Sequence, residues 1–456
     1  MPVEDLNGVL SRHGGHPTSA TLPTRFRRGN FASSILTAAT VVGALAASGG
    51  FSAGTAAAAS SNAPIVVGGD GDLAISAGVA QGFEAGISRF DKAGGLDGRK
   101  IQFTGFLDDA FNPATNLSNA QELVQSKHVM AVVPFSSEVA TGSTGSFLAA
   151  NEVPFIGWSV NAAFETEPKW GLGINGNQGN PEVQGLAGMR QALAATGNTK
   201  TPGKAKIAFI GVNTPGGSIA NSALAGVAKY TGMKVVYQQA PVPAAGTTSY
   251  APYASALISS GANIVYEVLA SAGSVGLAAQ LKADNYKGII INGVTYFPGQ
   301  LASQPNEESA LNGVYVEDEF PADENDTPAV QQAEKDLKAV GQPPDLTSGV
   351  AVGYWSAIVF EQMLKATLKA EGGNPAKATG ATLEKTVTSG FTYTDPITGG
   401  IGSETFPAAE TIPTGCGTLV KTTGTTFKQV TPYQCLGAVN VQTDKVVSQT
   451  TGKASS

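Results

Sequence analysis

Short apolar runs alternate with helix-like stretches along most of the chain. The β-branched runs at Ile65–Val67 and Met130–Val133 predict buried strands. Between them, residues 77–91 place apolar side chains on one face at helical spacing, which predicts an amphipathic helix. Asn112 followed by Pro113 predicts an N-cap and the first residue of a second helix. Repeated β-α-β units of this kind predict an α/β fold with a doubly wound parallel sheet.

The same alternation starts again after the Gly- and Asn-rich segment 171–181. Apolar strand patterns recur between residues 207 and 292, separated by helical stretches, and predict a second α/β lobe. Two longer helical stretches follow at 329–340 and 350–369. The predicted organisation is a signal peptide and leader at 1–59, lobe I at 60–180, lobe II at 181–320, a return to lobe I at 321–400, a C-terminal segment with a disulfide at 401–440, and a flexible tail at 441–456.

The first 60 residues have the order of a secretory signal. The basic cluster Arg25–Arg28 precedes an apolar stretch at 31–45, and small residues end near 55–60, with cleavage expected at 57–59. The alternative, a membrane anchor, needs an apolar run of roughly 20 residues, longer than the one present. We therefore expect an exported protein, periplasmic or at the cell envelope. No cysteine follows the leader, so we expect no lipid attachment at the mature N-terminus.

The two cysteines, Cys416 and Cys435, agree with export, because a pair outside the cytoplasm can oxidise to a disulfide. The composition excludes several other classes. With 14% charged residues and a net charge of −7, the chain lacks the basic clusters that nucleic-acid binding requires. It has three histidines, two of them within the first sixteen residues, which argues against a multi-histidine metal site or a histidine-dependent triad. We expect a monomeric binding protein without cofactor or metal, not an enzyme.

Two acidic segments have alternative interpretations. Gly69–Ala74 is similar to a dinucleotide-binding loop, but Asp70 and Asp72 would repel a pyrophosphate, so we interpret the segment as a flexible turn at the rim of a cleft. Glu317–Glu319 belongs to an acidic stretch that lacks the spacing of a calcium loop, and we interpret it as a solvated connection.

Ligands of parallel sheets bind outside the carboxyl ends of the strands. The loops to expect there follow Val133, Ile156, Ile210, Val268 and Ile291. Pro134–Glu138, with Ser136 and Ser137, could present hydroxyl and N–H groups to a ligand, or one serine could only cap the next helix. Trp158 either packs in the core or forms a wall of the site.

Three segments in this order resemble the type I periplasmic binding proteins, in the leucine/isoleucine/valine-binding branch: 106–113, 131–137 and 151–161. Residues 82–87 and 91–98 match the first helix and turn of that family, and the similarity runs from about 64 to about 369. The resemblance implies two α/β lobes joined by three crossovers. It also implies that the lobes close on a small solute and present it to the membrane permease of an ABC importer.

The resemblance implies that first-lobe loops bind the carboxylate and ammonium of an amino acid. The residues that we expect at the site are Ser136, Ser137, Trp158, Ser159, Val160 and Asn161 in the first lobe and Ser271, Thr295 and Tyr296 in the second. The family's acidic partner for the ammonium is expected after Asn292, where Gly293 and its neighbours stand instead. Because an unpaired buried ammonium is costly, a neutral amide, a carboxylate or another small polar solute fits as well.

We therefore expect an exported solute-binding protein that works by hinge closure in a branched-chain amino acid-like uptake system. A secreted receptor or sensor module of the same fold is the alternative. An exported hydrolase is a third interpretation, and it would need a carboxylate outside any motif found here.

Overall fold

The computed structural model describes residues 63–293, 296–299, 301–394 and 403–447, which belong to one compact unit, residues 57–456. The predicted signal peptide and cleavage site lie outside the described residues. Within the described ranges, every helix is too short or too polar to span a bilayer.

The first sheet has five parallel strands in the order β2-β1-β3-β4-β5. All six residues of its central strand β3 are buried, as expected for a strand covered on both faces. Asn112 caps helix α2 as predicted, because its side chain accepts the N–H groups of Ala114 and Thr115. The elements are β1 Ile65–Gly71, α1 Val79–Lys92, β2 Ile101–Asp108, α2 Pro113–Gln121 with a π-turn at Glu122–Ser126, β3 Ala131–Ser136, α3 Gly142–Ala150, β4 Phe155–Gly157, α4 Ala162–Thr166 and β5 Gly171–Gly173.

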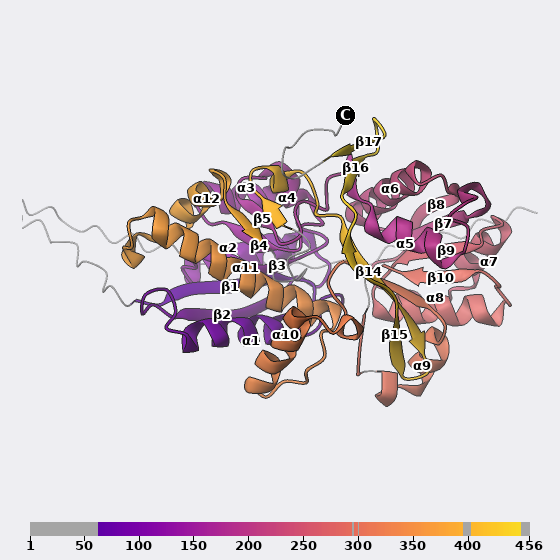
Figure 1. The fold of residues 1–456 in the computed structure, drawn as a ribbon, viewed down its shortest axis with the longest axis horizontal. Helices are drawn as coiled ribbons and strands as arrows, with labels where there is room; N and C mark the ends of the chain where they lie inside the picture. The colour runs from indigo at the N-terminus through magenta and orange to yellow at the C-terminus, as the bar shows by residue number, and fades with distance from the viewer. Residues whose placement is uncertain (1–62, 294–295, 300, 395–402, 448–456) are drawn as a thin grey trace, which may run out of the picture. The chain divides into compact units, whose positions relative to one another are not determined.

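Three helices from late in the chain return to the core of this first sheet: α10 (Pro328–Ala339), α11 (Ser348–Ala370) and α12 (Gly380–Thr388). In Figure 1 they are the orange helices beside the indigo and purple elements. Helix α11 packs closely on α1, since a Cβ at Gly353 would lie 1.9 Å from the carbonyl oxygen of Val79. Only glycine permits this approach of two backbones.

The second sheet has seven strands in the order β15-β14-β11-β10-β9-β7-β8. Strands β7 to β11 are parallel, and β14 and β15 add an antiparallel edge. The elements are α5 Ala187–Ala195, β7 Lys206–Val212, α6 Pro215–Tyr230, β8 Lys234–Val242, α7 Ala251–Ser259, β9 Ile264–Val268, α8 Ser271–Ala283, β10 Ile289–Asn292, α9 Pro305–Leu311, β11 Tyr315–Asp318, β14 Cys416–Thr423 and β15 Thr426–Cys435.

The chain passes between the cores of the two sheets three times. The connecting segments are residues 174–186, after β5, residues 319–327, between β11 and α10, and residues 411–415, before β14. This agrees with the two α/β lobes and three crossovers that the family resemblance implies. In Figure 1, β14 and β15 are the yellow strands at the edge of the sheet that contains β10, and β14 pairs with β11.

The C-terminal part of the chain contains more β-strands than its sequence predicts. The predicted disulfide is present between Cys416 and Cys435, which face each other across the β14–β15 hairpin. Strand β16 (Ala438–Asn440) pairs with β6 (Val183–Gly185) in the first connecting segment. Within the predicted flexible tail, Lys445–Val447 form β17 against β16, and residues 448–456 lie outside the described residues. Two short strands, β12 (Thr392–Thr394) and β13 (Ser403–Thr405), pair separately.

Candidate functional site

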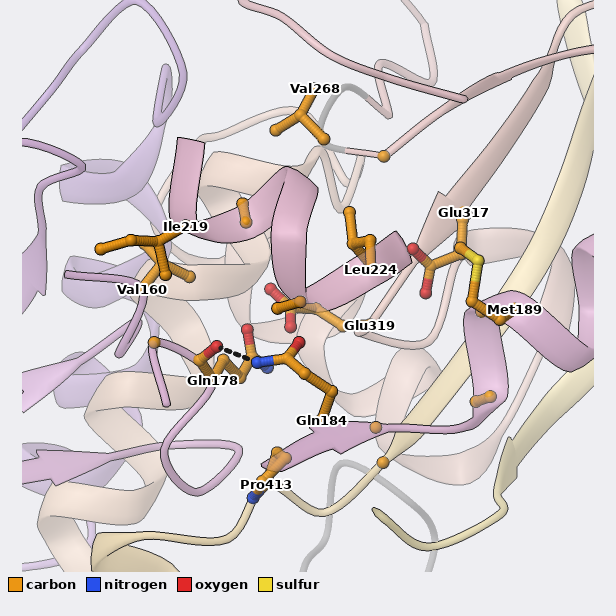
Figure 2. A pocket seen from close by; sticks show the side chains of 18 of the residues that line it. Val160, Gln178, Gln184, Met189, Ile219, Leu224, Val268, Glu317, Glu319 and Pro413 are labelled. Carbon is orange, nitrogen blue, oxygen red and sulfur yellow. Dashed lines mark hydrogen bonds between the residues drawn. The ribbon is translucent and has the colours of Figure 1, made fainter. Parts of the chain in front are cut away.

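A cavity of about 170 Å³ lies where loops of both sheets and all three connecting segments meet (Figure 2). From the first sheet, the loops after β3 and β4 contribute Glu138, Trp158 and Val160. The remaining lining residues are Gln178, Gly179, Gln184, Gly185, Ala187, Gly188, Met189, Gly216, Gly217, Ile219, Ala220, Ala223, Leu224, Tyr266, Val268, Gly293, Glu317, Glu319, Pro413, Thr414, Gly415 and Cys416. The carboxyl ends of the parallel strands thus form the cavity, as expected for sheets of this kind.

Helix α6 forms an apolar wall of the cavity. Ile219, Ala220, Ala223 and Leu224 line it at spacings of one helical turn, so a single face of the helix is presented. Ile219 is 39% exposed and lines the cavity. Val160, Met189 and Val268 extend this apolar surface from other elements (Figure 2).

Three carboxyl groups also reach the cavity: Glu138, Glu317 and Glu319. Among the described residues that line it there is no Lys, Arg or His. Glu317 and Glu319 point the same way because alternate residues of an extended chain share a face, while Asp318 between them is 5% exposed and accepts the N–H of Phe320. The interpretation of Glu317–Glu319 as a solvated connection is therefore wrong, since Asp318 is buried and Glu317 and Glu319 are half-buried beside the cavity.

Glu317 is held between β9 and α5. The Tyr266 hydroxyl donates to its Oε2 at 2.6 Å. Gly188 leaves room for the carboxyl group, because a Cβ there would lie 2.7 Å from the Glu317 Cδ. Burial raises the pKa of Glu317 to about 7, and the hydrogen bond from Tyr266 opposes that rise.

The other two carboxyl groups are also shifted toward the protonated form. Burial raises the pKa of Glu319 well above its ordinary value, the charges of Glu317 and Asp318 add to this, and hydrogen bonds from Gln178 and Trp158 oppose it. Burial, with the charges of Asp72 and Asp109, raises the pKa of Glu138 to about 8. Titratable groups with strongly shifted pKa values in a cavity are typical of functional sites.

Two glutamines from the first connecting segment complete the polar side of the cavity. The Trp158 indole Nε1 donates to Gln178 Oε1 at 3.0 Å. Gln184 Nε2 donates to the carbonyl oxygen of Gln178 at 3.0 Å (Figure 2). It also donates to the carbonyl oxygen of Asn180, at 2.7 Å. Trp158 packs on the first core with part of its surface and lines the cavity with another part. Its role as a wall of a ligand site stays a prediction.

The structure brings two of the first-lobe residues predicted from sequence to the cavity, Trp158 and Val160. The side chains of the other four are bonded inside the first lobe. Ser136 shares a hydrogen bond with the hydroxyl of Ser76; Ser137 donates to Asp109; Ser159 donates to the carbonyl oxygen of Gly176; Asn161 donates to that of Ser137 at 2.7 Å.

The second-lobe predictions lie elsewhere. Tyr296 is fully buried and its hydroxyl donates to Glu324 Oε2 at 2.6 Å. Ser271 is the first residue of α8 and is not among the residues that line the cavity, and Thr295 lies outside the described residues. A ligand-contact role for these residues and for the four serine and asparagine side chains of the first lobe stays a prediction.

Gly69–Gly71 form the end of strand β1, so the interpretation of Gly69–Ala74 as a flexible turn is wrong for these residues, and a turn begins only at Leu73. Asp70 is 0% exposed and Asp72 is 1% exposed. Asn116 Nδ2 donates to Asp70 at 2.9 Å and to Asp109 at 3.3 Å, and Asn119 Nδ2 donates to Asp70 at 2.9 Å. The buried side chains of Asp70 and Asp109 are thus the acceptors of a hydrogen-bonded network that joins β1, β2, α2 and the Ser137 loop.

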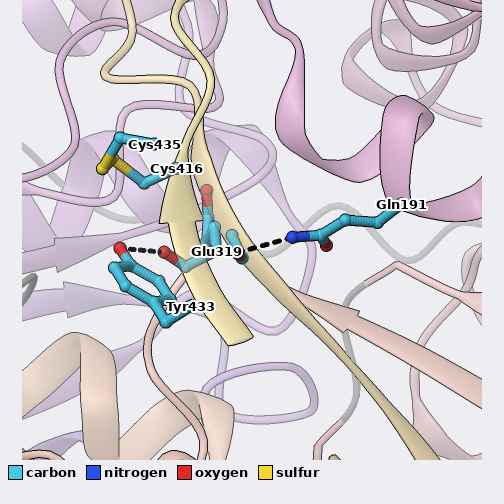
Figure 3. Close-up of a disulfide and its surroundings, with 6 residues drawn as sticks. Gln191, Glu319, Cys416, Tyr433 and Cys435 are labelled. Carbon is cyan, nitrogen blue, oxygen red and sulfur yellow. Dashed lines mark hydrogen bonds between the residues drawn. A yellow bond between two sulfur atoms is a disulfide. The ribbon is translucent and has the colours of Figure 1, made fainter. Parts of the chain in front are cut away.

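The disulfide hairpin supports the acidic side of the cavity (Figure 3). Tyr433, two residues before Cys435, donates its hydroxyl proton to the backbone oxygen of Glu319 at 2.8 Å. Cys416 itself lines the cavity. The hairpin thus fixes the backbone that carries Glu319.

None of the three glutamates was predicted at the site: Glu317 and Glu319 were considered only as part of a calcium loop, and Glu138 only as the end of a serine-containing loop. Glu317 and Glu319 share the two-residue period of a strand, and Glu138 closes the loop singled out at Pro134–Glu138, so local signals for each were present. Three or more His, Cys, Asp or Glu side chains arranged to hold a metal ion are not found in the described part of the chain.

Known structures share this fold. One is a solute binding protein of an ABC transporter from Rhodopseudomonas palustris in complex with 4-hydroxybenzoate, with a TM-score of 0.63, 19% identity, and coverage of 82% of this chain and 97% of that one. A second is a fatty acid ABC transporter substrate-binding protein from Thermomonospora curvata, with a TM-score of 0.64, 15% identity, and coverage of 81% of this chain and 92% of that one. A third is the branched-chain amino acid transporter substrate binding protein of Streptococcus pneumoniae in complex with isoleucine, with a TM-score of 0.61, 13% identity, and coverage of 82% of this chain and 99% of that one.

No curated protein matches the sequence. A family model described as periplasmic binding protein matches residues 38–425, which is most of the chain. This match confirms the interpretation as a binding protein rather than an enzyme, and membership implies export. Fold and family model together confirm the resemblance seen in the sequence: the chain belongs to the periplasmic binding protein family, in its type I, leucine/isoleucine/valine-binding-like group.

Proposed function

We propose that this chain is the solute-binding component of an ABC uptake system, which captures a small solute in the cavity and delivers it to a membrane permease. One observation carries the proposal: a single cavity receives side chains from both sheets and from all three connecting segments. A solute there would contact both lobes at once. Such a solute would stabilise the arrangement in which the lobes meet around it, which is the basis of hinge closure.

The walls of the cavity suit a solute with an apolar body and few polar groups. One face of α6 with Val160 and Val268 would bury apolar atoms, while Gln178, Gln184 and the glutamates would orient polar ones. Isoleucine, 4-hydroxybenzoate and a fatty acid, the solutes named for three structures of this fold, have apolar bodies of this kind.

Binding can be measured by thermal shift with a panel of amino acids, amides, amines, and aromatic and short-chain acids. A solute at 100 times its Kd stabilises the folded state by about 2.7 kcal/mol, which raises the melting temperature measurably. The protein should be purified without refolding, and a native mass spectrum should look for a retained small molecule. A panel in which no solute moves the transition, with no retained molecule, would contradict the proposal.

Trp158 provides a matched control for the site. It lines the cavity, whereas Trp355 is buried in the first core and Trp170 packs on a neighbouring cluster. A solute in the cavity should change the intrinsic fluorescence of the wild-type protein, and Trp158→Phe should remove most of that change. A signal that persists in Trp158→Phe but disappears in Trp170→Phe would place the solute elsewhere.

A further inference from the structure

The cavity holds three carboxyl groups and, among its described lining residues, no basic side chain. Glu317 and Glu319 come from the β11 end, and Glu138 comes from the loop after β3. None of the three takes part in an ion pair within the described residues. All three are half-buried, and clustered carboxylates that are partly removed from water without a cation are unfavourable, so protons or a positively charged ligand would stabilise them.

We propose that the solute is a small amine with an apolar body, and that its positively charged amino group binds between Glu317 and Glu319. The inference rests on the proposed function, because it names the class of solute for the same cavity. It differs from the expectation from sequence, in which the second lobe lacked a carboxylate for an ammonium group. Strand β11 supplies that carboxylate from a position 25 residues further along the chain than Asn292.

The surroundings of each carboxyl group are anionic or neutral. Glu317 faces the Tyr266 hydroxyl, and Glu319 faces Glu317, Asp318, Gln178 and Trp158. An acid anion placed among these groups would meet like charge, and no Lys or Arg in the described lining could offset it.

From the first lobe, Glu138 faces the charges of Asp72 and Asp109, so its surroundings are anionic as well. An anionic solute would therefore meet carboxyl groups from both lobes.

A zwitterionic amino acid is a poorer fit than the amine. Its carboxylate would need donors, and the first-lobe hydroxyls that the family resemblance assigns to this task already donate or share hydrogen bonds with Ser76, Asp109 and the carbonyl of Gly176. Glu138 would lie on the side of the cavity where that carboxylate should sit. The same apolar body without the carboxylate avoids both problems.

Binding of a cation should be coupled to release of protons. Burial raises the pKa of Glu317 to about 7 and that of Glu138 to about 8, so part of each group is protonated near neutral pH. A bound ammonium group favours the ionised forms. Affinity for the amine should therefore rise with pH, by roughly fourfold between pH 6.5 and 8.5 from Glu317 alone.

The test compares four solutes that share one branched skeleton: 3-methylbutylamine, leucine, 4-methylpentanoate and 4-methylpentanamide. Isothermal titration calorimetry at pH 6.5 and 8.5, in two buffers of different ionisation enthalpy, gives affinity and proton release together. We expect the amine to bind tightest, to bind more tightly at pH 8.5, and to release protons.

Tighter binding of leucine, the acid or the amide than of the amine would overturn the inference, as would affinity that falls with rising pH. In the wider panel of the preceding section, binding of acids or neutral solutes alone would overturn the charge assignment and leave the proposed function standing. If no solute of that panel binds, the proposed function itself fails.

Variants test the residues. Glu317→Gln and Glu319→Gln keep the shape of each side chain and remove its charge, and each should weaken binding of the amine about tenfold or more. Glu84→Gln, on the exposed face of α1 away from the cavity, is the matched control and should bind as the wild type. A single cooperative thermal transition and a wild-type circular dichroism spectrum verify that each variant folds. Unchanged affinity for the amine in both cavity variants would overturn the assignment.

Discussion

Replacing Ser137 with alanine should destabilise the protein rather than remove a ligand contact. The Ser137 side chain is 0% exposed; its hydroxyl donates to Asp109 and accepts the N–H groups of Val139, at 3.2 Å, and Ala140, at 3.1 Å. A hydrogen bond to a buried carboxylate contributes about 2 kcal/mol, and the bonds from the two loop N–H groups add about 1 kcal/mol. The expected loss is therefore about 3 kcal/mol in the free energy of unfolding. These bonds lie in the loop before α3, whose N-cap is Thr141, so the alternative in which a serine of Pro134–Glu138 caps the next helix is wrong.

The loss should depend on pH, and its sign follows from Asp109. Burial raises the pKa of Asp109 above its ordinary value, and the hydrogen bond from Ser137 opposes that rise. Without Ser137 the folded-state pKa rises further, so the folded state holds more protons than the unfolded state as pH increases. Stability then falls with rising pH, and the difference from wild type should be larger at pH 7.5 than at pH 4.

Urea denaturation followed by circular dichroism measures this difference, with equal m-values as the check that both proteins unfold alike. Ser146→Ala is the matched control, because Ser146 is an exposed serine of α3 whose hydroxyl donates to Glu167, and it should stay within about 0.5 kcal/mol of wild type. Ser137→Ala with wild-type stability but no solute binding would refute the reasoning. It would mean that Ser137 contacts the solute, as the family resemblance predicted.

Three further changes have expected outcomes. Burial raises the pKa of Glu138 to about 8, so ionisation of Glu138 destabilises the folded state as pH rises from about 4.5 to 8. Glu138→Gln should therefore raise the melting temperature clearly at pH 8.5 and only slightly at pH 5. An equal change in melting temperature at both pH values would contradict this. Replacing Cys416 and Cys435 together with serine should lower stability by about 3 kcal/mol in urea denaturation, as expected for a loop of this length, and an unchanged midpoint would argue against it. Gly353→Ala should push α1 from α11 and cost about 2 kcal/mol or more, with near-wild-type stability as the contrary result.

The sequence by itself determined the two α/β lobes. Strand and helix periods are local properties, so the strand expected to end at Val268 does end there, and Asn112 caps its helix as predicted by accepting the N–H groups of the residues that follow it. Glycine, serine and proline residues predict loops at the strand ends, and residues of those loops line the cavity. The hairpin β14–β15 was not predicted, because threonine- and glycine-rich strands that complete a sheet edge lack a clear apolar alternation.

Only the tertiary structure decided which side chains meet in the cavity. Glu138 and Glu317 are far apart in sequence and share a cavity because two sheets direct their strand ends to it. In the folded protein the Ser137 hydroxyl points inward and donates to Asp109. The position of Ser137 in a loop does not by itself reveal this partner. Local periods specify elements, whereas the burial of a carboxyl group and the partner of a hydroxyl depend on contacts between elements, which no local pattern contains.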